Sequence, residues 1–486
     1  MPIAPLTIPD YLGTDNRGLT SSFIDRLQSG LFALPRLAGI ALLAAGLVSA
    51  ALPANAQKRP LKVIRDAEIE MLLRDYAAPI FRAAGIGSRG AEIIILRDSS
   101  FNAFVASGSR LFINSGTLLT AKTPNEVIGV LAHETGHLAA GHLQGLRNEV
   151  ARAQAIGVLA TILGAGAAVA GAVAGSPDAA RAGAAATTIG PGVALRTLLR
   201  YRRTQESAAD NAAVSYLNAT GQSARGMLTT FRRFADQALF SKQYVDPYVL
   251  SHPMPNERIS QLERLAKKSP YFGKTDPVRL QLRHDLMRAK LSGFIEGPGR
   301  VQRRFPRSDK SLAAQYARAI VAYRTGSLRS ALKRIDGLIR QSPNYPYFHE
   351  LKGQALLESG KARKAIAPLR KAVSLAPSPG LIRILLGHAL LQTGDARSLK
   401  EAIGNLKAGL AAEPLAAIGY RHLSTAYARQ GRIAEAEVAT AQGLLIDGDI
   451  KAAHNYAKRA QAKLKRGTPA WLQADDIIAY KLPKTR

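Results

Sequence analysis

The chain of 486 residues contains no cysteine, one tryptophan and five methionines. The missing cysteine excludes a disulfide framework, a thiolate metal ligand and a lipid-modified N-terminal cysteine. Acidic residues are also scarce, with 35 Asp and Glu against 66 Lys and Arg, so the formal net charge is +31. This excess of positive charge indicates an anionic partner: nucleic acid, an acidic protein or an anionic lipid surface. The composition, with 47% hydrophobic and 21% charged residues, is that of a globular protein of two or three domains.

The first 56 residues indicate where the protein works. Arg36 precedes the apolar run Leu37 to Val48, and Ala54-Asn55-Ala56 forms a small-residue cleavage site. This order is typical of a secretory signal peptide, with cleavage expected after Ala56. The leader is longer than usual, so a misplaced start codon and retention as an N-terminal anchor both stay open. An exported protein is expected to have no nucleic-acid partner despite its charge.

The most informative stretch is His133-Glu134-Thr135-Gly136-His137, within a run from Asn125 to Leu146 that has the pattern of a helix. Residues i and i+4 lie on the same helix face, so the two imidazoles can bind one zinc ion. Glu134 lies beside them and could deprotonate a water molecule on the metal. The alternative is a chance match to a short motif. Other segments of the chain are needed to distinguish a zinc site from a chance match.

A catalytic zinc usually takes three protein ligands, so one more must come from elsewhere. Glu206 and Asp210 are one helical turn apart in the stretch from Tyr201 to Asp210. Glu206 could bind the metal while Asp210 accepts the free ring N–H of a ligand histidine. Alone, these carboxylates would be an ordinary solvated helix face, but the upstream motif favours the metal site.

Three short segments upstream of the motif predict a small sheet. They are rich in β-branched or aromatic residues and comprise residues 91–97, 102–106 and 109–114. The last two flank Gly108, as in a hairpin with a tight turn. A strand such as the one with Phe112 could pair with an extended peptide substrate, or the pair could be an ordinary core hairpin. The segment Ala67 to Ala84 has helical periodicity and is expected to pack beside the helix with the histidines.

In combination, these motifs resemble the metallopeptidases related to HtpX and to the CAAX prenyl endopeptidases. The matching stretches are His133-Glu134-x-x-His137 with His142, Arg203-x-x-Glu206-x-x-Ala209-Asp210, Ser251-His252-Pro253, Arg258-Ile259, Asn102-Ala103-Phe104 and Phe112 to Gly116. The resemblance implies a zincin-type α+β fold of the HExxH gluzincin kind. It implies one Zn2+ per chain, bound by His133, His137 and Glu206. Glu134 would be the general base, and Asp210 would hydrogen-bond to a ligand histidine without binding the metal itself.

Two further histidines need separate treatment. His142 follows His137 by five residues, which rotates it off the ligand face, so a structural or surface role is expected. His252 is expected in a loop before Pro253, and loops can bring a side chain over a site. His252 could act as a gate, as a fourth zinc ligand that blocks the water position, or as a donor to the oxyanion formed in the reaction.

Between the two zinc segments, residues 155–175 consist only of Ala, Gly, Val, Ile and Leu with one Thr. The run is long enough to span a bilayer, but Ala and Gly contribute little transfer free energy. Residues 176–191 also have mostly small side chains. We expect the whole insert to be a mobile hairpin or lid over the cleft that touches a membrane or an unfolded client, and a true membrane span is the alternative.

Past Pro270 the chain carries a helical repeat. Glycines recur every 34 residues, at Gly326, Gly360 and Gly394. A three-residue insertion near residues 398–401 shifts the next landmarks. This period predicts four tetratricopeptide repeats from about Ala313 to Gly448, with a divergent helical unit before them and a closing unit after them. Stacked repeats form a solenoid with a concave groove.

The positive charge lies largely in this repeat region. Residues 301–486 contain 32 Lys and Arg against 13 Asp and Glu, a difference of +19, whereas residues 1–56 sum to zero. A basic groove would attract acidic client segments or an anionic membrane surface. Alternatively, the basic side chains are solvated helix surface.

The expected fold is mainly α: a zincin-type metalloprotease domain with a small sheet, then an α-solenoid. The expected parts are a signal peptide at 1–56, a zinc metalloprotease domain at 57–270, a tetratricopeptide domain at 271–479 and a basic tail at 480–486. This architecture resembles the BepA-type periplasmic proteases of Gram-negative bacteria. The resemblance implies a periplasmic endopeptidase for misassembled envelope or outer-membrane proteins, whose repeats dock clients or the assembly machinery. The alternative is a periplasmic chaperone or scaffold with a latent or vestigial protease site.

Overall fold

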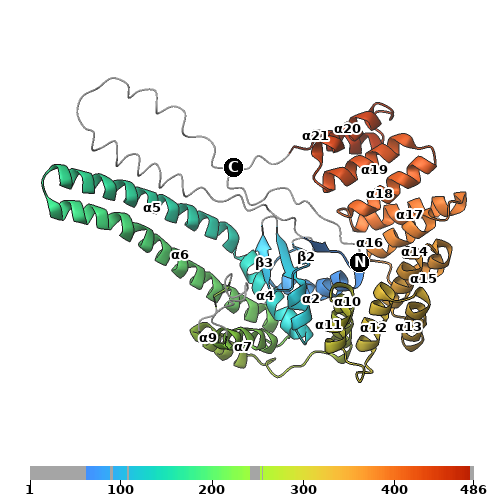
Figure 1. Ribbon diagram of the computed structural model, residues 1–486, viewed down its shortest axis with the longest axis horizontal. Coiled ribbons are helices and arrows are strands. Elements are labelled where there is room, and N and C mark those ends of the chain that lie inside the picture. The colour runs from blue at the N-terminus through green and yellow to red at the C-terminus, as the bar shows by residue number, and fades with distance from the viewer. Residues whose placement is uncertain (1–61, 88–90, 107–108, 241–251, 254–255, 482–486) are drawn as a thin grey trace.

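The computed structural model describes residues 62–87, 91–106, 109–240, 252–253 and 256–481. The predicted signal peptide at 1–56 and most of the predicted tail at 480–486 lie outside these residues. A central body with a small sheet separates a long helical hairpin on one side from a curved stack of helices on the other (Figure 1). The chain is mainly helical, as expected.

Four short strands form one sheet in the order β1-β2-β4-β3. Their bounds are β1 Val63–Ile64, β2 Glu92–Leu96, β3 Ala103–Ala106 and β4 Arg110–Asn114. β2 runs parallel to β4, and β3 runs antiparallel to β4 with Phe104 opposite Phe112. The three predicted strands are confirmed. The strand that contains Phe112 is paired on both sides, so the expectation that it pairs with a peptide is wrong; the edge on that side is β3.

Helix α4 (Pro124–Ala139) carries the His-Glu-x-x-His motif. Its first turn is fixed by Thr123, whose side chain accepts a hydrogen bond from a first-turn amide, and by a proline at the start of the helix. The helix ends because Gly141 adopts the left-handed conformation, with φ of 64°, and a new helix begins at His142. The single helix predicted from Asn125 to Leu146 is therefore two helices.

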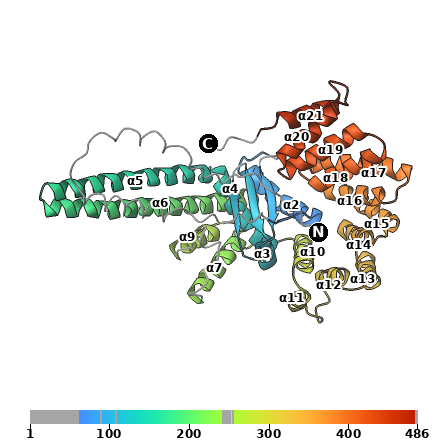
Figure 2. The same ribbon diagram turned by 45° about the horizontal axis from the view of Figure 1, so that its top comes forward.

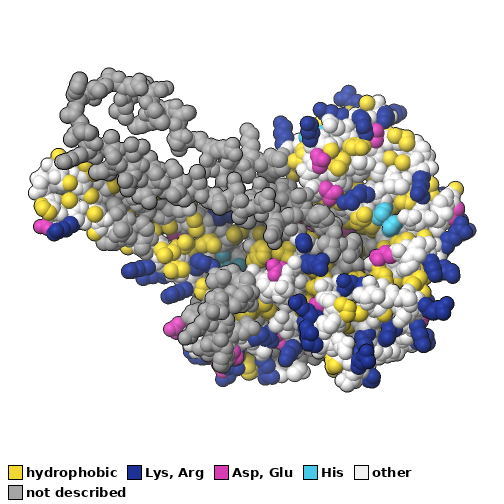
Figure 3. Space-filling view, in the orientation of Figure 1, with side chains coloured by type: hydrophobic (Ala, Val, Ile, Leu, Met, Phe, Trp, Pro, Cys, Tyr) yellow, Lys and Arg dark blue, Asp and Glu magenta, His cyan; other side chains and the backbone are white. Residues whose placement is uncertain are grey.

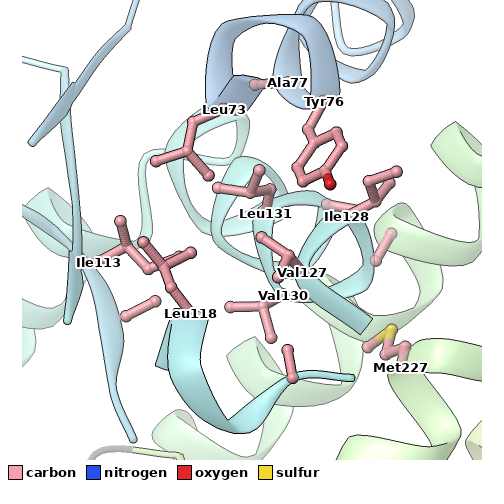
Figure 4. Close-up of a cluster of buried hydrophobic side chains, with 14 of the residues drawn as sticks. Leu73, Tyr76, Ala77, Ile113, Leu118, Val127, Ile128, Val130, Leu131 and Met227 are labelled. Atoms are coloured by element: carbon pink, nitrogen blue, oxygen red, sulfur yellow. The ribbon is translucent and has the colours of Figure 1, made fainter. Parts of the chain in front are cut away.

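α4 lies at the centre of the hydrophobic core of the body (Figure 4). Its apolar side chains meet those of α2 (Ala67–Ala83), α3 (Ser115–Thr120), α7 (Arg225–Phe240) and strand β4. The residues labelled in Figure 4 are Leu73, Tyr76, Ala77, Ile113, Leu118, Val127, Ile128, Val130, Leu131 and Met227. Helix α9 (Asn256–Lys267) packs on α6 and α7 from the other side. The expected packing of the segment from Ala67 beside the motif helix is confirmed.

Helices α5 (His142–Val173) and α6 (Pro177–Ala219) form an antiparallel hairpin that extends away from the body (Figures 1 and 2). The predicted hairpin is confirmed. Residues 176–191 are helical from Pro177 onward, because alanine, the strongest helix former, outweighs the glycines in this stretch. The hairpin extends away from the body, so among the described residues it is not the predicted lid (Figures 1 and 2).

The remaining helices pair into stacked repeats. Their bounds are α10 Val278–Ile295, α11 Pro298–Arg304, α12 Leu312–Thr325, α13 Leu328–Gln341, α14 Pro346–Glu358, α15 Ala362–Leu375, α16 Gly380–Leu391, α17 Ala396–Ala412, α18 Ala417–Arg429, α19 Ile433–Ile446, α20 Ile450–Gln461 and α21 Pro469–Ala479. The four predicted repeats correspond to α12–α13, α14–α15, α16–α17 and α18–α19. The insertion near residues 398–401 lies in α17, which has 17 residues where α13 and α15 have 14. α10 contributes side chains to the cores of both the body and the solenoid, and the predicted boundary at residue 270 stays a prediction.

The body docks against the inner curve of the solenoid through buried charges. The Nζ atom of Lys290 lies 2.9 Å from Asp66 Oδ2 and 3.3 Å from Glu68 Oε2, both in the body. It also lies 3.1 Å from Glu350 Oε2 in the solenoid. The hydroxyl of Tyr316 donates to Glu68 at 2.9 Å. Since buried charges must be paired, these contacts fix how the body sits on the repeats.

The inner face of the solenoid holds a cavity of about 730 Å³. The charged residues that line it are Arg65, Arg421, Asp66, Glu350, Glu358 and Asp447. Acidic side chains outnumber basic ones there, so the predicted basic groove is not found in this cavity. Lys and Arg side chains are instead spread over the outer surface of the solenoid, which agrees with the alternative of a solvated helix surface (Figure 3).

The close approach of α4 to α6 can be tested at Gly136. A Cβ added there would lie 2.9 Å from the carbonyl oxygen of Ala209 and 3.0 Å from its Cα, both backbone atoms of α6. We expect Gly136→Ala to destabilise the local structure by about 1–3 kcal/mol, measured by hydrogen exchange of the α4 amides. Gly404→Ala is the control, because no heavy atom lies within 4 Å of its added Cβ. Unchanged exchange in α4 of the Gly136 variant would contradict the close packing.

Candidate metal centre

Helix α4 presents His133 and His137 on one face, one turn apart. Their Nε2 atoms lie 3.1 Å from each other, and the His133 side chain is fully buried. Glu134, the residue after the first histidine, is also buried. Neither of its carboxylate oxygens has a hydrogen-bond partner among the described residues.

Helix α6 brings Glu206 and Asp210 to the same place. Glu206 Oε1 lies 3.4 Å from His137 Nε2, and Glu206 Oε2 lies 3.4 Å from His133 Nε2. Asp210 Oδ1 lies 2.9 Å from Nδ1 of His133, on the other side of the ring. A carboxylate in this position fixes the orientation of an imidazole whose Nε2 binds a metal.

His252 joins the cluster from a third part of the chain, just before α9. Its Nδ1 lies 3.1 Å from both carboxylate oxygens of Glu206 and 3.4 Å from His133 Nε2. Its Nε2 lies 3.5 Å from Glu134 Oε1. One donor atom from each of four residues, His133, His137, Glu206 and His252, lies within 4.8 Å of the others.

This donor set fits a divalent metal ion. A tetrahedral site with metal–nitrogen bonds of about 2.0–2.1 Å puts its ligand atoms about 3.3 Å apart. The donor atoms of His133, His137 and Glu206 are separated by 3.1 to 3.4 Å. The buried Glu134 carboxylate has no hydrogen-bond partner in the described part of the chain. A bound cation with a polar ligand beside it would satisfy these groups, whose burial is otherwise costly.

Arg258 on α9 ties the loop of His252 to α6. Its Nε and Nη2 donate to the Asp210 carboxylate at 2.5 Å and 2.8 Å. Its Nη1 lies 2.8 Å from Glu206 Oε2 and donates to the carbonyl oxygen of Pro253 at 2.9 Å. Arg258 was recognised in the sequence only as part of a family motif, without a role. Spacing gives no signal for such a role, because the contact joins residues that lie 48 positions apart.

His142 also reaches the site, although not as a member of the donor cluster. Its Nδ1 lies 3.0 Å from His137 Nδ1, so it contacts the outer side of that ring. The rotation argument from the sequence does not apply, because α4 ends before Gly141 and His142 begins a new helix. The chain turn at Gly141 thus gives His137 a partner, as Asp210 is the partner of His133.

The charges of the site shift the pKa values of its members in different directions. Burial lowers the pKa of His133, but the contacts with Asp210 and Glu206 outweigh it and raise the pKa to about 9. Burial lowers the pKa of His137 to about 4. Burial raises the pKa of Glu206, but hydrogen bonds from the histidines lower it far more, so this carboxylate is ionised. Burial raises the pKa of Glu134, which suits a group that accepts and returns a proton.

A buried glutamate next to a metal held by two helices is the arrangement with which metalloproteases activate water, and that is the class of protein defined here. The comparison with protein families gives the narrower answer. Residues 64–266 match the model of peptidase family M48, so this part of the chain is similar to that family. Residues 316–380 and 384–453 match tetratricopeptide repeats, which confirms the repeat prediction.

The curated relatives are distant. The beta-barrel assembly-enhancing protease of Yersinia pestis is 25% identical over 390 residues, covering 77% of this chain and 75% of that protein. The protease of the same name from Escherichia coli K12 is 25% identical over 309 residues, covering 60% of this chain and 58% of that protein. A Vibrio cholerae relative is 28% identical over 264 residues, covering 52% of this chain and 51% of that protein. The chain thus spans between about half and three quarters of these relatives.

Among solved structures, the crystal structure of MamA is 20% identical and covers 33% of this chain and 90% of its own, with a TM-score of 0.27. A likeness of this size supports no conclusion about the present chain.

The contact between Asp210 and His133 predicts a loss of metal affinity on substitution. We expect Asp210→Asn to weaken zinc binding by about 10–100-fold, because the variant loses the charge that orients the His133 ring and pairs with Arg258. Affinity would be measured by competition with a chelator on the purified chain. Asp178→Asn, at the far end of the hairpin where the side chain is 97% exposed, is the matched control. If both variants bound zinc equally well, Asp210 would have no such role.

Proposed function

We propose that this chain is a periplasmic zinc-dependent endopeptidase that hydrolyses peptide bonds of misassembled envelope or outer-membrane proteins. The observation that carries the proposal is the Glu134 carboxylate, which is buried, lacks a hydrogen-bond partner among the described residues and lies beside four metal donors. A buried carboxylate in this state costs free energy, and a role in proton transfer explains its presence.

In this proposal, His133, His137 and Glu206 hold one Zn2+ per chain. An imidazole-rich set with one carboxylate suits zinc, which then supplies a Lewis acid for the activation of water and of the peptide carbonyl. Glu134 accepts the proton of the attacking water and returns it to the leaving amine. Asp210 keeps the ring of His133 in its binding orientation through the 2.9 Å contact.

The substrate class is supported by three observations. The relatives from Yersinia pestis and Escherichia coli are named beta-barrel assembly-enhancing proteases. The first 56 residues have the order of a secretory signal peptide. The repeats supply a curved surface of the kind that binds other proteins. We infer that the repeats dock clients or the outer-membrane assembly machinery and thereby raise the client concentration near the metal.

The edge strand β3 is the proposed docking place for the backbone of a client. Within the described residues β3 pairs with β4 on one side only, so its other side can add a strand, whereas β4 is paired on both sides. β3 also packs against α4, the helix that carries Glu134. An extended peptide paired with β3 would therefore run beside the helix of the metal centre.

His252 is proposed as the gate of the site. Both its 3.1 Å distances to Glu206 and its 3.4 Å distance to His133 Nε2 place it among the metal donors. As a fourth ligand it would occupy the position that water needs, so it must move away before cleavage. The other role, a donor to the oxyanion, requires His252 to face the substrate and stand clear of the ligands.

A second function is a periplasmic chaperone or scaffold whose protease activity is latent. Two observations favour it: the cavity of about 730 Å³ on the inner face of the solenoid, and the position of His252 among the donors. The two functions share the same surfaces and differ in whether Glu134 acts.

Glu134→Gln is expected to abolish cleavage of an unfolded protein such as casein, with a fall of more than about 100-fold, since the amide cannot accept the proton. Zinc content should not change, because Glu134 is not a ligand. Glu401→Gln on α17, a partly exposed position, is the control. Normal cleavage by the Glu134 variant would contradict the proposed endopeptidase mechanism. Full rescue of a null strain by a cleavage-deficient Glu134 variant would favour the scaffold.

His252→Ala is expected to raise the rate of casein cleavage, because removal of the fourth donor opens the water position. A matched substitution, His349→Ala, changes a partly exposed histidine on α14 and should leave the rate as it is. A lower rate for the His252 variant would assign it to the oxyanion. No change at all would discard both roles.

A further inference from the structure

The α5–α6 hairpin carries an apolar surface that none of the described residues covers. Exposed bulky side chains occur along both helices, at Ile156, Val158, Leu159, Ile162, Leu163, Val169, Val173, Val193, Leu195 and Leu199. Their exposed fractions range from 40% for Leu199 to 84% for Val173. Hydrophobic side chains are visible over the free end of the hairpin in Figure 3. Contiguous exposed apolar surface of this kind marks a site of interaction.

Helix α5 has the composition and exposure of a segment whose surroundings are lipid. The stretch from His142 to Ala170 is long and apolar enough to cross a membrane, and only 6% of its most apolar 18 residues are buried. A core helix would be mostly buried, and a signal sequence would lie near the N-terminus, so neither explains it. Residues 155–175 contain no charge. Their one hydroxyl, of Thr161, donates to the carbonyl oxygen of Gly157 at 2.8 Å, so it needs no water.

Arginines mark the end of the apolar segment that is nearer the body. We call these four residues the arginine collar: Arg147 and Arg152 on α5, Arg196 and Arg200 on α6. The hydroxyl of Tyr201 on α6 lies against Gly145 on α5, which sets the register of the antiparallel pair. The same offset places Arg147 within about one residue of the level of Arg200, and Arg152 within about two residues of the level of Arg196. At about 1.5 Å per residue, Arg147 and Arg152 lie about 8 Å apart along α5, so the collar forms a band across both helices.

We propose that the α5–α6 hairpin inserts into an anionic lipid bilayer, with the arginine collar at the headgroups. From Arg152 to Val173, the last residue of α5, the helix rises about 32 Å at about 1.5 Å per residue, enough to cross a hydrocarbon layer of about 30 Å. Asp178 and Arg181, near the turn of the hairpin, then reach the opposite headgroup layer. The guanidinium groups of the collar bind lipid phosphates, for which their planar donors are suited.

Charge and geometry favour lipid over other occupants. A headgroup layer is anionic and several Å deep, so it matches a band of cationic side chains at one end of an apolar helical hairpin. The formal net charge of +31 acts in the same direction. An unfolded client or a second copy of the chain would use the apolar side chains but gives no reason for the collar. The inference does not depend on the proposed protease function, because membrane binding is measured without cleavage.

The test is flotation of the full chain with vesicles of phosphatidylcholine, alone or with phosphatidylglycerol. The unchanged chain should float with the anionic vesicles. The double variant Leu159→Glu, Leu163→Glu should bind them at least about tenfold less, because two charges would enter the hydrocarbon. The control is Val278→Glu, Leu282→Glu on α10, which has the same spacing and exposed side chains of 87% and 42%, and it should float like the unchanged chain.

The collar and the depth of insertion are tested separately. Replacing all four collar arginines by alanine should remove the preference for phosphatidylglycerol over pure phosphatidylcholine vesicles. Because the chain has no cysteine, a single Leu163→Cys substitution can carry an environment-sensitive dye. Its emission should shift to the blue with vesicles and be quenched by lipids that carry a spin label deep in the acyl chain. The same dye at Leu472→Cys, on α21 and half exposed, should respond to neither.

Three results would overturn the inference. The unchanged chain could stay with the solution at low salt in the presence of anionic vesicles. The Leu159→Glu, Leu163→Glu variant could float as well as the control. In a third case, no form of the chain would bind vesicles, but the Leu159→Glu, Leu163→Glu variant would lose self-association or binding of an unfolded client. That result would assign the apolar surface of the hairpin to a protein partner.

Discussion

The metal centre depends on the close packing of α4 against α6 at Gly136. With no side chain at that position, the backbone of Ala209 can approach the motif helix until Glu206 and Asp210 reach the two histidines. Arg258 then holds both carboxylates from the side of α9. The geometry of the site thus depends on how closely α4 and α6 pack. Its charged side chains are arranged around the contact between two uncharged residues, Gly136 and Ala209.

The solenoid is attached to this arrangement through buried ion pairs. Lys290 neutralises carboxylates from α2 and α14 in a buried cluster, and Arg65 pairs with Glu413 at 2.7 Å farther along the inner curve. Separation of the two parts would expose charges that have lost their partners, which is costly. Any protein that docks on the repeats is therefore held at a defined distance and direction from the sheet edge at β3.

The sequence was sufficient wherever spacing along one element determined the answer. The pairs His133 with His137 and Glu206 with Asp210 are each one helical turn apart, and the repeat period of 34 residues predicted the four helix pairs of the solenoid. It was insufficient where two segments meet without a local signal. Three features could not be predicted for this reason: the strand order in which β4 is paired on both sides, the contacts of Arg258, and the break in the helix after α4. A lid and a projecting hairpin have the same composition. Only the packing of the ends of α5 and α6 against the body shows in which direction the hairpin extends.

Helix α6 is one uninterrupted helix of 43 residues, and in mechanical terms it is a lever. Its pinned point is Asp210, held by Arg258; Glu206 lies about 6 Å from that point and Pro177 about 50 Å, at about 1.5 Å per residue. A swing of about 4 Å at the far end would therefore displace Glu206 by about 0.5 Å, more than the tolerance of about 0.2 Å in metal–ligand distances. The helix therefore connects the distant end of the hairpin mechanically to the candidate metal donors.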